Sequence, residues 1–274
     1  MGFLQNFLID DEVLARVRKI ELPWSRHGID PYGIEQPEVA RMMSILGLLY
    51  KRYFRVTCHG IQHVPARGRV MVVGNHSGGW ALDALMVLAS LFYEKDPPRL
   101  AHGMAEKFIN RLPFASSLTA ASGQFTGIPE NAERLLGDDR VLMVFPEGAR
   151  GTAKLYWQRN SLVRFGTGFV RLAMQMKAPI VPVGFAGGGE AIPTVLNLVR
   201  LGKLMGVPYI PVTPWLIALP RPNVRLHLEY GEPIFFEGTG QEDDDVIEAK
   251  VAIVQDRIRA LIDSAVVARK EGSA

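Results

Sequence analysis

A histidine and an aspartate follow an apolar run that is typical of a buried strand. After VMVVG (70–74) the chain reads NHSGGWALD, which places His76 seven positions before Asp83. An imidazole that a carboxylate holds in place can take a proton from a hydroxyl group. The Gly-Gly pair between them favours a loop, so that His76 can fold back onto the first turn of a helix that begins near residue 80. For this pair taken alone, an ordinary helix cap is the simpler interpretation.

Two further apolar runs also end in polar residues and unusual backbone. VFPEGARG (144–151) turns sharply at Gly148 and presents Glu147 and Arg150. APIVPVGFAGGGE (178–190) ends in a glycine-rich segment, and the prolines inside it indicate an irregular strand. Ligands bind α/β proteins at the carboxyl ends of the strands, so the three exits predict a binding site at one edge of a sheet.

Strand-like and helix-like patterns alternate along the chain and predict the elements that must position these residues. The apolar runs typical of strands are 54–58, 70–74, 118–123, 141–145, 179–185 and 224–230. The patterns typical of helices are 37–54, 82–95, 129–137, 161–177 and 244–266. This alternation predicts an α/β fold with a largely parallel central sheet flanked by helices.

Residues 1–53 are expected to form an N-terminal helical extension, and residues 54–274 the α/β domain. The extension is rich in apolar residues, so its helices either lie in a membrane interface or pack on the sheet. The stretch between Glu38 and Asp83 holds no acidic residue and six lysines and arginines. Such a basic face fits an anionic lipid surface or a phosphate-bearing ligand, although chance clustering on a solvated surface explains it equally well.

The composition limits the class of protein. The 274 residues have a formal net charge of +3, are 48% hydrophobic and include one cysteine, Cys58. A single cysteine excludes a disulfide framework and a cysteine-based zinc site, and it favours a reducing compartment. The six histidines show no metal-ligand spacing, so we expect no metal site. The sequence has no recognisable signal peptide and no uncharged, proline-free stretch long enough to span a membrane.

Four motifs resemble, in their order and rough spacing, the blocks of the glycerolipid acyltransferase superfamily, which includes the lysophosphatidic acid acyltransferases. The motifs are His76…Asp83, FPEG (145–148), PIVPV (179–183) and GEPI (231–234). The resemblance covers about residues 55–235. Six residues separate the histidine from the aspartate where the family usually has four, which resembles a bacterial-type branch with an expanded block. The second block usually ends in an arginine, and here Thr126 and Gly127 occupy that region, which argues against a glycerol-phosphate acceptor.

The resemblance implies a glycerolipid acyltransferase-like fold and the transfer of a fatty acyl group from acyl-CoA or acyl-carrier protein. The acceptor would be a hydroxyl of a glycerolipid or lysophospholipid, as in phospholipid biosynthesis. His76 would be the general base, and Asp83 would orient it. Backbone N–H groups of Ser77, Gly78 and Gly79 are the candidates for binding the oxyanion, since glycine allows a close approach. No cofactor is implied besides the thioester co-substrate.

The acceptor is expected to contact the second strand exit. The resemblance implies that Glu147, Gly148 and Arg150 bind it, with the guanidinium of Arg150 on its polar head. For Glu147 taken alone, a turn residue that accepts backbone hydrogen bonds is the simpler interpretation. Lys154 and Arg159 follow in the sequence and are expected to be surface residues.

We therefore expect a peripheral enzyme on the cytoplasmic face of a membrane, with the lipid surface and the thioester donor as partners and no nucleic-acid partner. The proline-interrupted loop 204–219 is a candidate lining for the acyl chain and a candidate membrane-dipping lid, with plain core as its alternative. Two other functions fit the same scaffold. One is a non-catalytic lipid-binding or transfer protein in which His76 is a cap. The other is a lipid thioesterase or hydrolase in which water replaces the acceptor.

Overall fold

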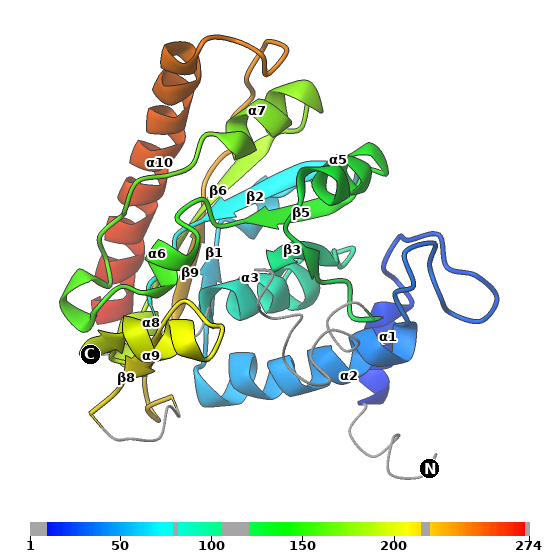
Figure 1. Ribbon diagram of the computed structural model, residues 1–274. Coiled ribbons are helices and arrows are strands. Elements are labelled where there is room, and N and C mark those ends of the chain that lie inside the picture. The colour runs from blue at the N-terminus through cyan, green and yellow to red at the C-terminus, as the bar shows by residue number, and fades with distance from the viewer. Residues whose placement is uncertain (1–9, 79–81, 106–120, 215–219, 272–274) are drawn as a thin grey trace.

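The computed structural model describes residues 10–78, 82–105, 121–214 and 220–271. Within these residues a seven-stranded sheet forms the centre of the molecule (Figure 1). In spatial order its strands are β1 (Thr57–His59), β9 (His227–Tyr230), β6 (Ile180–Ala186), β2 (Val70–Gly74), β5 (Val141–Val144), β3 (Ala101–Ala105) and β4 (Phe125–Thr126). Neighbouring strands run parallel, except that β6 and β9 are antiparallel. The predicted α/β fold with a largely parallel, helix-flanked sheet is confirmed.

Helices cover both faces of the sheet, because each strand turns alternate side chains to opposite sides. In β2, Val70 and Val72 join one buried cluster, whereas Met71 and Val73 join another. The first cluster includes side chains of α1 (Asp11–Val17), α2 (Gln36–Gly47) and α3 (Leu82–Tyr93). The second includes side chains of α5 (Pro129–Gly137), α7 (Gly168–Gln175) and α10 (Asp244–Glu271) (Figure 1). Because both faces of these strands are buried, their sequences are continuous apolar runs and do not alternate with polar residues.

The N-terminal helices pack on α3 through their apolar faces. Val17 of α1 and Met43 of α2 are fully buried in the cluster that also holds α3. A π-helical stretch, Leu48–Tyr53, continues α2 toward β1. The opposite face of this segment leaves Ile45, Leu48 and Tyr53 exposed. No helix among the described residues combines the length and the apolar character that a membrane crossing requires.

A group of short elements lies beside the carboxyl end of the sheet. It contains α6 (Ala149–Thr152), a 3₁₀ turn (Tyr156–Gln158), α8 (Gly188–Ala191) and α9 (Val199–Leu204). It also contains an antiparallel pair of strands, β7 (Leu196–Leu198) and β8 (Ile210–Val212). Another 3₁₀ turn, Ile61–His63, follows β1.

Two predicted elements differ from the structure. The helix predicted for 161–177 begins only at Gly168, because the N–H of Val163 is held by a side chain of the site rather than by a helical carbonyl. The strand predicted for 118–123 is wrong for residues 121–123, which have helical or turn backbone, and residues 118–120 lie outside the described part. The strand that follows this region is the two-residue β4, Phe125–Thr126. β3 also has no predicted counterpart, because its sequence AHGMA lacks a clear apolar pattern.

Candidate active site

The site lies where the parallel strands β2, β5 and β6 end at the same edge of the sheet. Asn75, directly after β2, ties two of these ends together: its Nδ2 donates to the Phe185 carbonyl at 3.1 Å, and its Oδ1 accepts from the Phe185 N–H at 2.8 Å. Asn75 is fully buried, and satisfying both backbone groups of Phe185 offsets the cost of burying its amide. The chain that follows β2 is therefore anchored before it reaches His76.

His76 and Asp83 are in contact despite the six residues between them. Nδ1 of His76 lies 2.9 Å from Oδ1 of Asp83, which is fully buried at the start of α3. The carboxylate also accepts from the N–H groups of Ser77, at 3.0 Å, and Ala84, at 2.8 Å. An ionised carboxylate only accepts, so Nδ1 carries the proton of the neutral imidazole and the lone pair is on Nε2. The ring of Phe145 stacks on the imidazole at 4.5 Å and fixes its plane.

Glu147 and Lys154 form a buried ion pair behind this histidine. Nζ of Lys154 lies 2.6 Å from Oε2 of Glu147 and 2.5 Å from the His76 carbonyl oxygen. Glu147 also accepts from the N–H groups of His76, at 2.9 Å, and Val163, at 2.8 Å. Burial lowers the pKa of Lys154, and the neighbouring Glu147 carboxylate opposes this effect. The pair joins the exits of β2 and β5 and holds the backbone of His76 from both sides.

The contacts of Glu147 agree with the simpler of its two interpretations. Glu147 is 1% exposed and its oxygens bind two backbone N–H groups and an ammonium, so it positions the loop, and a role in acceptor binding stays a prediction. Lys154 is buried and part of the site, although its sequence context predicted a surface residue. The short helix α6 lies between Glu147 and Lys154, and no local pattern in the sequence indicates that these two residues are paired. Arg159 is half-buried and pairs with Glu190 at 2.9 Å.

The candidate oxyanion donors are only partly available. The N–H of Ser77 donates to Asp83, which contradicts the expectation that it faces the reaction centre. Its Oγ is buried beside Gly188, where an added Cβ would come within 2.1 Å. Gly78 has a φ of +84° and its Cα lies against the Lys154 carbonyl, so a side chain there would be strained. Gly79, the third candidate, lies outside the described residues.

The FPEG turn is sharp because Gly148 adopts a φ of 57° and a ψ of −152°, which glycine alone adopts readily. Its N–H donates to the Phe145 carbonyl at 3.0 Å. Arg150 is exposed on α6, and its Nη2 donates to the Arg164 carbonyl at 3.2 Å. The guanidinium is therefore accessible to solvent, unlike the carboxylate three residues before it.

Gly151 provides space for the histidine. A Cβ at this position would approach the Cβ atoms of Glu147 and His76 to 2.7 and 2.8 Å, distances that side chains do not tolerate. The backbone of α6 therefore lies directly against the imidazole and the ion pair. The sequence places this glycine three residues after Gly148 but does not show what it contacts.

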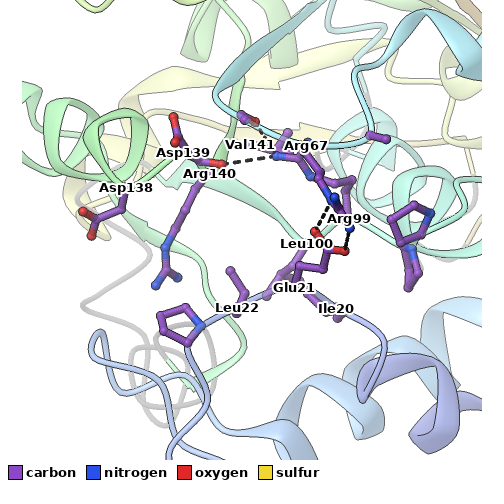
Figure 2. A pocket seen from close by; sticks show the side chains of 15 residues that line it. Ile20, Glu21, Leu22, Arg67, Arg99, Leu100, Asp138, Asp139, Arg140 and Val141 are labelled. Atoms are coloured by element: carbon purple, nitrogen blue, oxygen red, sulfur yellow. Dashed lines mark hydrogen bonds and ion pairs between the residues drawn. The ribbon is translucent and has the colours of Figure 1, made fainter.

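A pocket of about 200 Å³ lies at the other end of the strands (Figure 2). Leu100, Arg140 and Val141 line it, and these residues lie at or just before the amino ends of β3 and β5. Arg99 points along its wall and donates to the carbonyls of Pro65 and Gly68. Because parallel strands present their binding edge at the carboxyl ends, this pocket is separate from the His76 site.

The fold also assembles one cluster with metal-ligand chemistry among the described residues. His59, His227 and Glu229 each offer one ligand atom, and these atoms lie within 4.8 Å of one another. The three come from β1 and the neighbouring β9, 168 positions apart in the sequence. The spacing argument that predicted no metal site could not detect a set that only strand pairing creates.

The chain is similar to known proteins in sequence and in fold. The sequence model of the Acyltransferase family matches residues 55–186. An uncharacterized protein of Mycobacterium tuberculosis is 31% identical over 229 residues, which are 80% of this chain and 63% of that protein. One of Mycobacterium leprae is 32% identical over 253 residues, 89% of this chain and 64% of that protein. The chain thus spans less than two thirds of the length of these curated relatives.

Two more distant matches have assigned names. A chicken (Gallus gallus) protein called DGAT1/2-independent enzyme synthesizing storage lipids is 24% identical over 197 residues, 71% of this chain and 57% of that protein. The crystal structure of the 1-acyl-sn-glycerophosphate acyltransferase PlsC from Thermotoga maritima superposes with a TM-score of 0.56. That match is 14% identical and covers 94% of this chain and 91% of PlsC, so it establishes a shared fold. Residues 55–186 of this chain match the Acyltransferase family in sequence, and the match to PlsC extends the shared fold beyond them.

Proposed function

We propose that this protein transfers a fatty acyl group from a thioester, acyl-CoA or acyl-carrier protein, to a hydroxyl of a glycerolipid or lysophospholipid. The observation that carries the proposal is the 2.9 Å contact between His76 and Asp83 at the carboxyl edge of the sheet. In this pairing the Nδ1 side of the imidazole is held by Asp83, and Nε2 is the nitrogen left to accept a proton from a hydroxyl. The match of residues 55–186 to the Acyltransferase family supports the choice of acyl transfer over other reactions of an activated hydroxyl.

In the proposed reaction Nε2 of His76 takes the proton of the acceptor hydroxyl as its oxygen attacks the thioester carbonyl carbon. A C–O bond forms, and the carbonyl oxygen becomes the oxyanion of a tetrahedral intermediate. The C–S bond then breaks, and the thiolate leaves with the proton that His76 received. Asp83 stabilises the imidazolium between these steps. The scheme uses no protein nucleophile, in keeping with the residues around Ser77, which do not form a G-x-S-x-G motif.

Donors for the oxyanion would come from the loop after His76. Gly78 and Gly79 remain the candidates, because the N–H of Ser77 is already bonded to Asp83. Arg150 remains the candidate for a polar or anionic group of the substrates, since its guanidinium is exposed next to the FPEG turn. Gly148 shapes that turn, and Glu147 supports it from the buried side.

For the acceptor we favour a neutral glyceride, a lysophospholipid or a larger hydroxylated lipid over a glycerol phosphate. The region around Thr126 and Gly127 lacks the arginine that the second family block usually supplies for a phosphate. The chicken relative is named for the synthesis of storage lipids, which is compatible with a neutral acceptor. We further propose that the protein works peripherally on the cytoplasmic face of a membrane, where such acceptors reside.

The proposal is tested by product analysis. Purified protein is incubated with palmitoyl-CoA or palmitoyl-acyl-carrier protein and vesicles that contain diacylglycerol, lysophosphatidylcholine or lysophosphatidic acid. We expect acylated lipid from one of the first two acceptors. Free fatty acid without acylated lipid would instead identify a hydrolase, and lipid binding without turnover would identify a binding or transfer protein. Strong selectivity for lysophosphatidic acid would contradict the acceptor assignment.

A further inference from the structure

The segment from β7 to the end of α9 exposes an unusual number of apolar side chains. Leu204 is 84% exposed and Met205 66% exposed. Val195, Leu196, Leu198, Val199 and Leu201 are exposed as well. Contiguous apolar surface of this kind on a folded protein indicates an interaction site.

Aromatic side chains extend this surface. The N–H of Tyr156 donates to the Thr194 carbonyl at 2.8 Å, which brings the neighbouring Trp157, 65% exposed, next to the start of the segment. Tryptophan and tyrosine are the residues that concentrate at the boundary between lipid and water. We name the surface formed by Tyr156, Trp157 and residues 195–205 the β7–α9 surface.

The charge of this region favours an anionic partner. Residues 191–228 contain no aspartate or glutamate, whereas they contain Arg200, Lys203, Arg221 and Arg225. Arg200 and Lys203 lie on α9 itself and are exposed among the apolar side chains. Apolar side chains interspersed with cations match a bilayer that has an anionic surface, since each cation near it adds about 1 kcal/mol of attraction.

The β7–α9 surface is attached to the active site by side chains. Nδ2 of Asn197 in β7 donates to the Ala153 carbonyl at 2.6 Å, and the Tyr209 hydroxyl donates to Oγ1 of Thr152 at 2.6 Å. Thr152 and Ala153 directly precede Lys154, which binds the His76 carbonyl. Contact at this surface would therefore place the mouth of the site at the membrane. Figure 1 shows α9 toward the same end of the molecule as α2.

We infer that the β7–α9 surface docks this protein onto an anionic lipid bilayer, an inference that rests on the proposed acyl transfer to a membrane lipid. Docking positions the acceptor hydroxyl for His76 while the body of the protein stays in water. The surface is distinct from the N-terminal helices, whose exposed Ile45 and Leu48 lie next to Asp10 and Glu12. Lys51 and Arg52 line the same hollow, so two cations balance the two carboxylates there and this face offers less net attraction to an anionic surface than α9 does.

The test is co-sedimentation with vesicles of phosphatidylcholine alone or of phosphatidylcholine mixed with phosphatidylglycerol, which is anionic. The double variant Leu204→Ser, Met205→Ser should reduce binding to anionic vesicles by about tenfold or more, because two apolar side chains no longer enter the bilayer. The variant Arg200→Ala, Lys203→Ala should do the same on anionic vesicles and have little effect on neutral ones. The control Ile253→Ser, Val267→Ser removes comparably exposed apolar residues of α10 and should bind like wild type.

Activity separates this inference from the proposed function. On an acceptor dispersed in detergent, the Arg200→Ala, Lys203→Ala variant should turn over like wild type, whereas on anionic vesicles it should be slower. Loss of turnover with the detergent-dispersed acceptor as well as with vesicles would mean that the surface acts in catalysis and not in docking. Vesicle binding that is unchanged by Leu204→Ser, Met205→Ser overturns the inference. It is also overturned if the N-terminal variant Ile45→Ser, Leu48→Ser is the one that loses binding. A concentration-dependent dimer that the Leu204→Ser, Met205→Ser change dissociates would identify a second copy as the occupant.

A separate observation points to a cation site on the edge strands. Nδ1 of His59 lies 3.4 Å from Oε2 of Glu229, and Nε2 of His227 lies 3.0 Å from the same oxygen. Ligands bound to a tetrahedral zinc ion at about 2.0–2.2 Å are separated by roughly 3.3–3.6 Å, and all three atoms already lie within 4.8 Å of one another, so side-chain rotations would close the set. His227 is buried, whereas His59 is 55% exposed, so the cluster can be reached from solvent on the His59 side.

The geometry points to a zinc-binding site formed by His59, His227 and Glu229 that joins β1 to β9. Chelator-treated protein titrated with Zn²⁺ should bind one equivalent and gain thermal stability, and Mg²⁺ should give neither effect. His59→Ala removes an exposed ligand without disturbing the core and should weaken zinc binding at least tenfold. His27→Ala, at another exposed histidine, should leave it unchanged. Failure of the wild type to bind zinc in a saturable manner, or unaltered binding by His59→Ala, overturns the assignment.

Discussion

Lys154 and Glu147 form an ion pair with both side chains at most 1% exposed, and each partner also binds the backbone of His76. The carboxylate accepts the His76 N–H, and the ammonium donates to the His76 carbonyl. A buried pair of this kind contributes more to defining a geometry than to net stability, because desolvation offsets most of its attraction. Here the geometry that it defines is that of the proposed general base.

The first prediction concerns this pair. Lys154→Met leaves a buried carboxylate without its cation and should lower the free energy of unfolding by about 3–5 kcal/mol. Glu147→Gln combined with Lys154→Met removes both charges and should recover part of that loss. Denaturant unfolding of the two single variants and the double variant measures the coupling. Additive effects would show that the two groups do not depend on each other.

The second prediction concerns the space beside His76. Gly151→Ala places a methyl group against the Cβ atoms of His76 and Glu147, so the imidazole must shift. Because misplacement of a catalytic group by about 1 Å can cost roughly 10²-fold, kcat should fall by about that factor. Gly168→Ala is the control, since an added methyl there has no neighbour within 4 Å. Equal kcat values for Gly151→Ala and wild type would indicate that His76 lies elsewhere in the working enzyme.

Sequence patterns were sufficient for the overall fold. The strand 70–74 and the helix 129–137 have the predicted bounds, since a continuous apolar run and a Pro-to-Gly segment are strong local signals. The contact between His76 and Asp83 also followed from local sequence, because a glycine pair permits the required turn. The β3 strand was missed because its histidine and glycine interrupt the apolar pattern.

The contacts that complete the site depend on tertiary structure. Glu147 accepts hydrogen bonds from the N–H of His76, 71 positions earlier, and from the N–H of Val163. Val163 lies in a segment that was predicted to be helical but is not. Lys154 is buried by contacts that are distant in sequence: it binds His76 and Glu147, and Asn197 and Tyr209 bind the two residues before it. No pattern within a window of local sequence contains this information, so the sequence alone did not show that Glu147 is buried and that Lys154 is its partner.

A third prediction is a dependence of stability on pH. His102 in β3 is fully buried, its Nδ1 lies 2.8 Å from the Gly123 carbonyl, and burial lowers its pKa to about 4 from 6.5. Between these values the unfolded chain binds more protons than the folded chain, so stability rises with pH there. The contribution, about 3 kcal/mol, is complete above pH 6.5 and is lost as the pH falls toward 4.

His102→Asn tests this assignment, because an amide at this position can donate to Gly123 but does not titrate. The variant should lose less stability than wild type between pH 7 and pH 4.5 in thermal unfolding. His27→Asn changes an exposed histidine and should retain the wild-type dependence. A wild-type slope in His102→Asn would assign the pH dependence to other groups.

The fourth prediction separates charge from shape in the proposed dyad. Asp83→Asn preserves the size of the side chain but no longer favours the Nδ1–H form of His76 or stabilises its imidazolium. We expect kcat to fall by roughly 10³–10⁴-fold, with KM little changed. Steady-state kinetics on a dispersed acceptor, with circular dichroism as the check on folding, provide the measurement. A decrease below tenfold would mean that the carboxylate acts only as a cap for α3.

The most direct measurement for the central claim is single-turnover acyl transfer by His76→Ala, followed by mass spectrometry of the acylated lipid. If His76 is the general base, the rate constant should fall by at least about 10²–10⁴-fold, while vesicle binding and thermal stability stay close to wild type. A rate constant within tenfold of wild type, in a variant that is folded and binds lipid, would contradict the account.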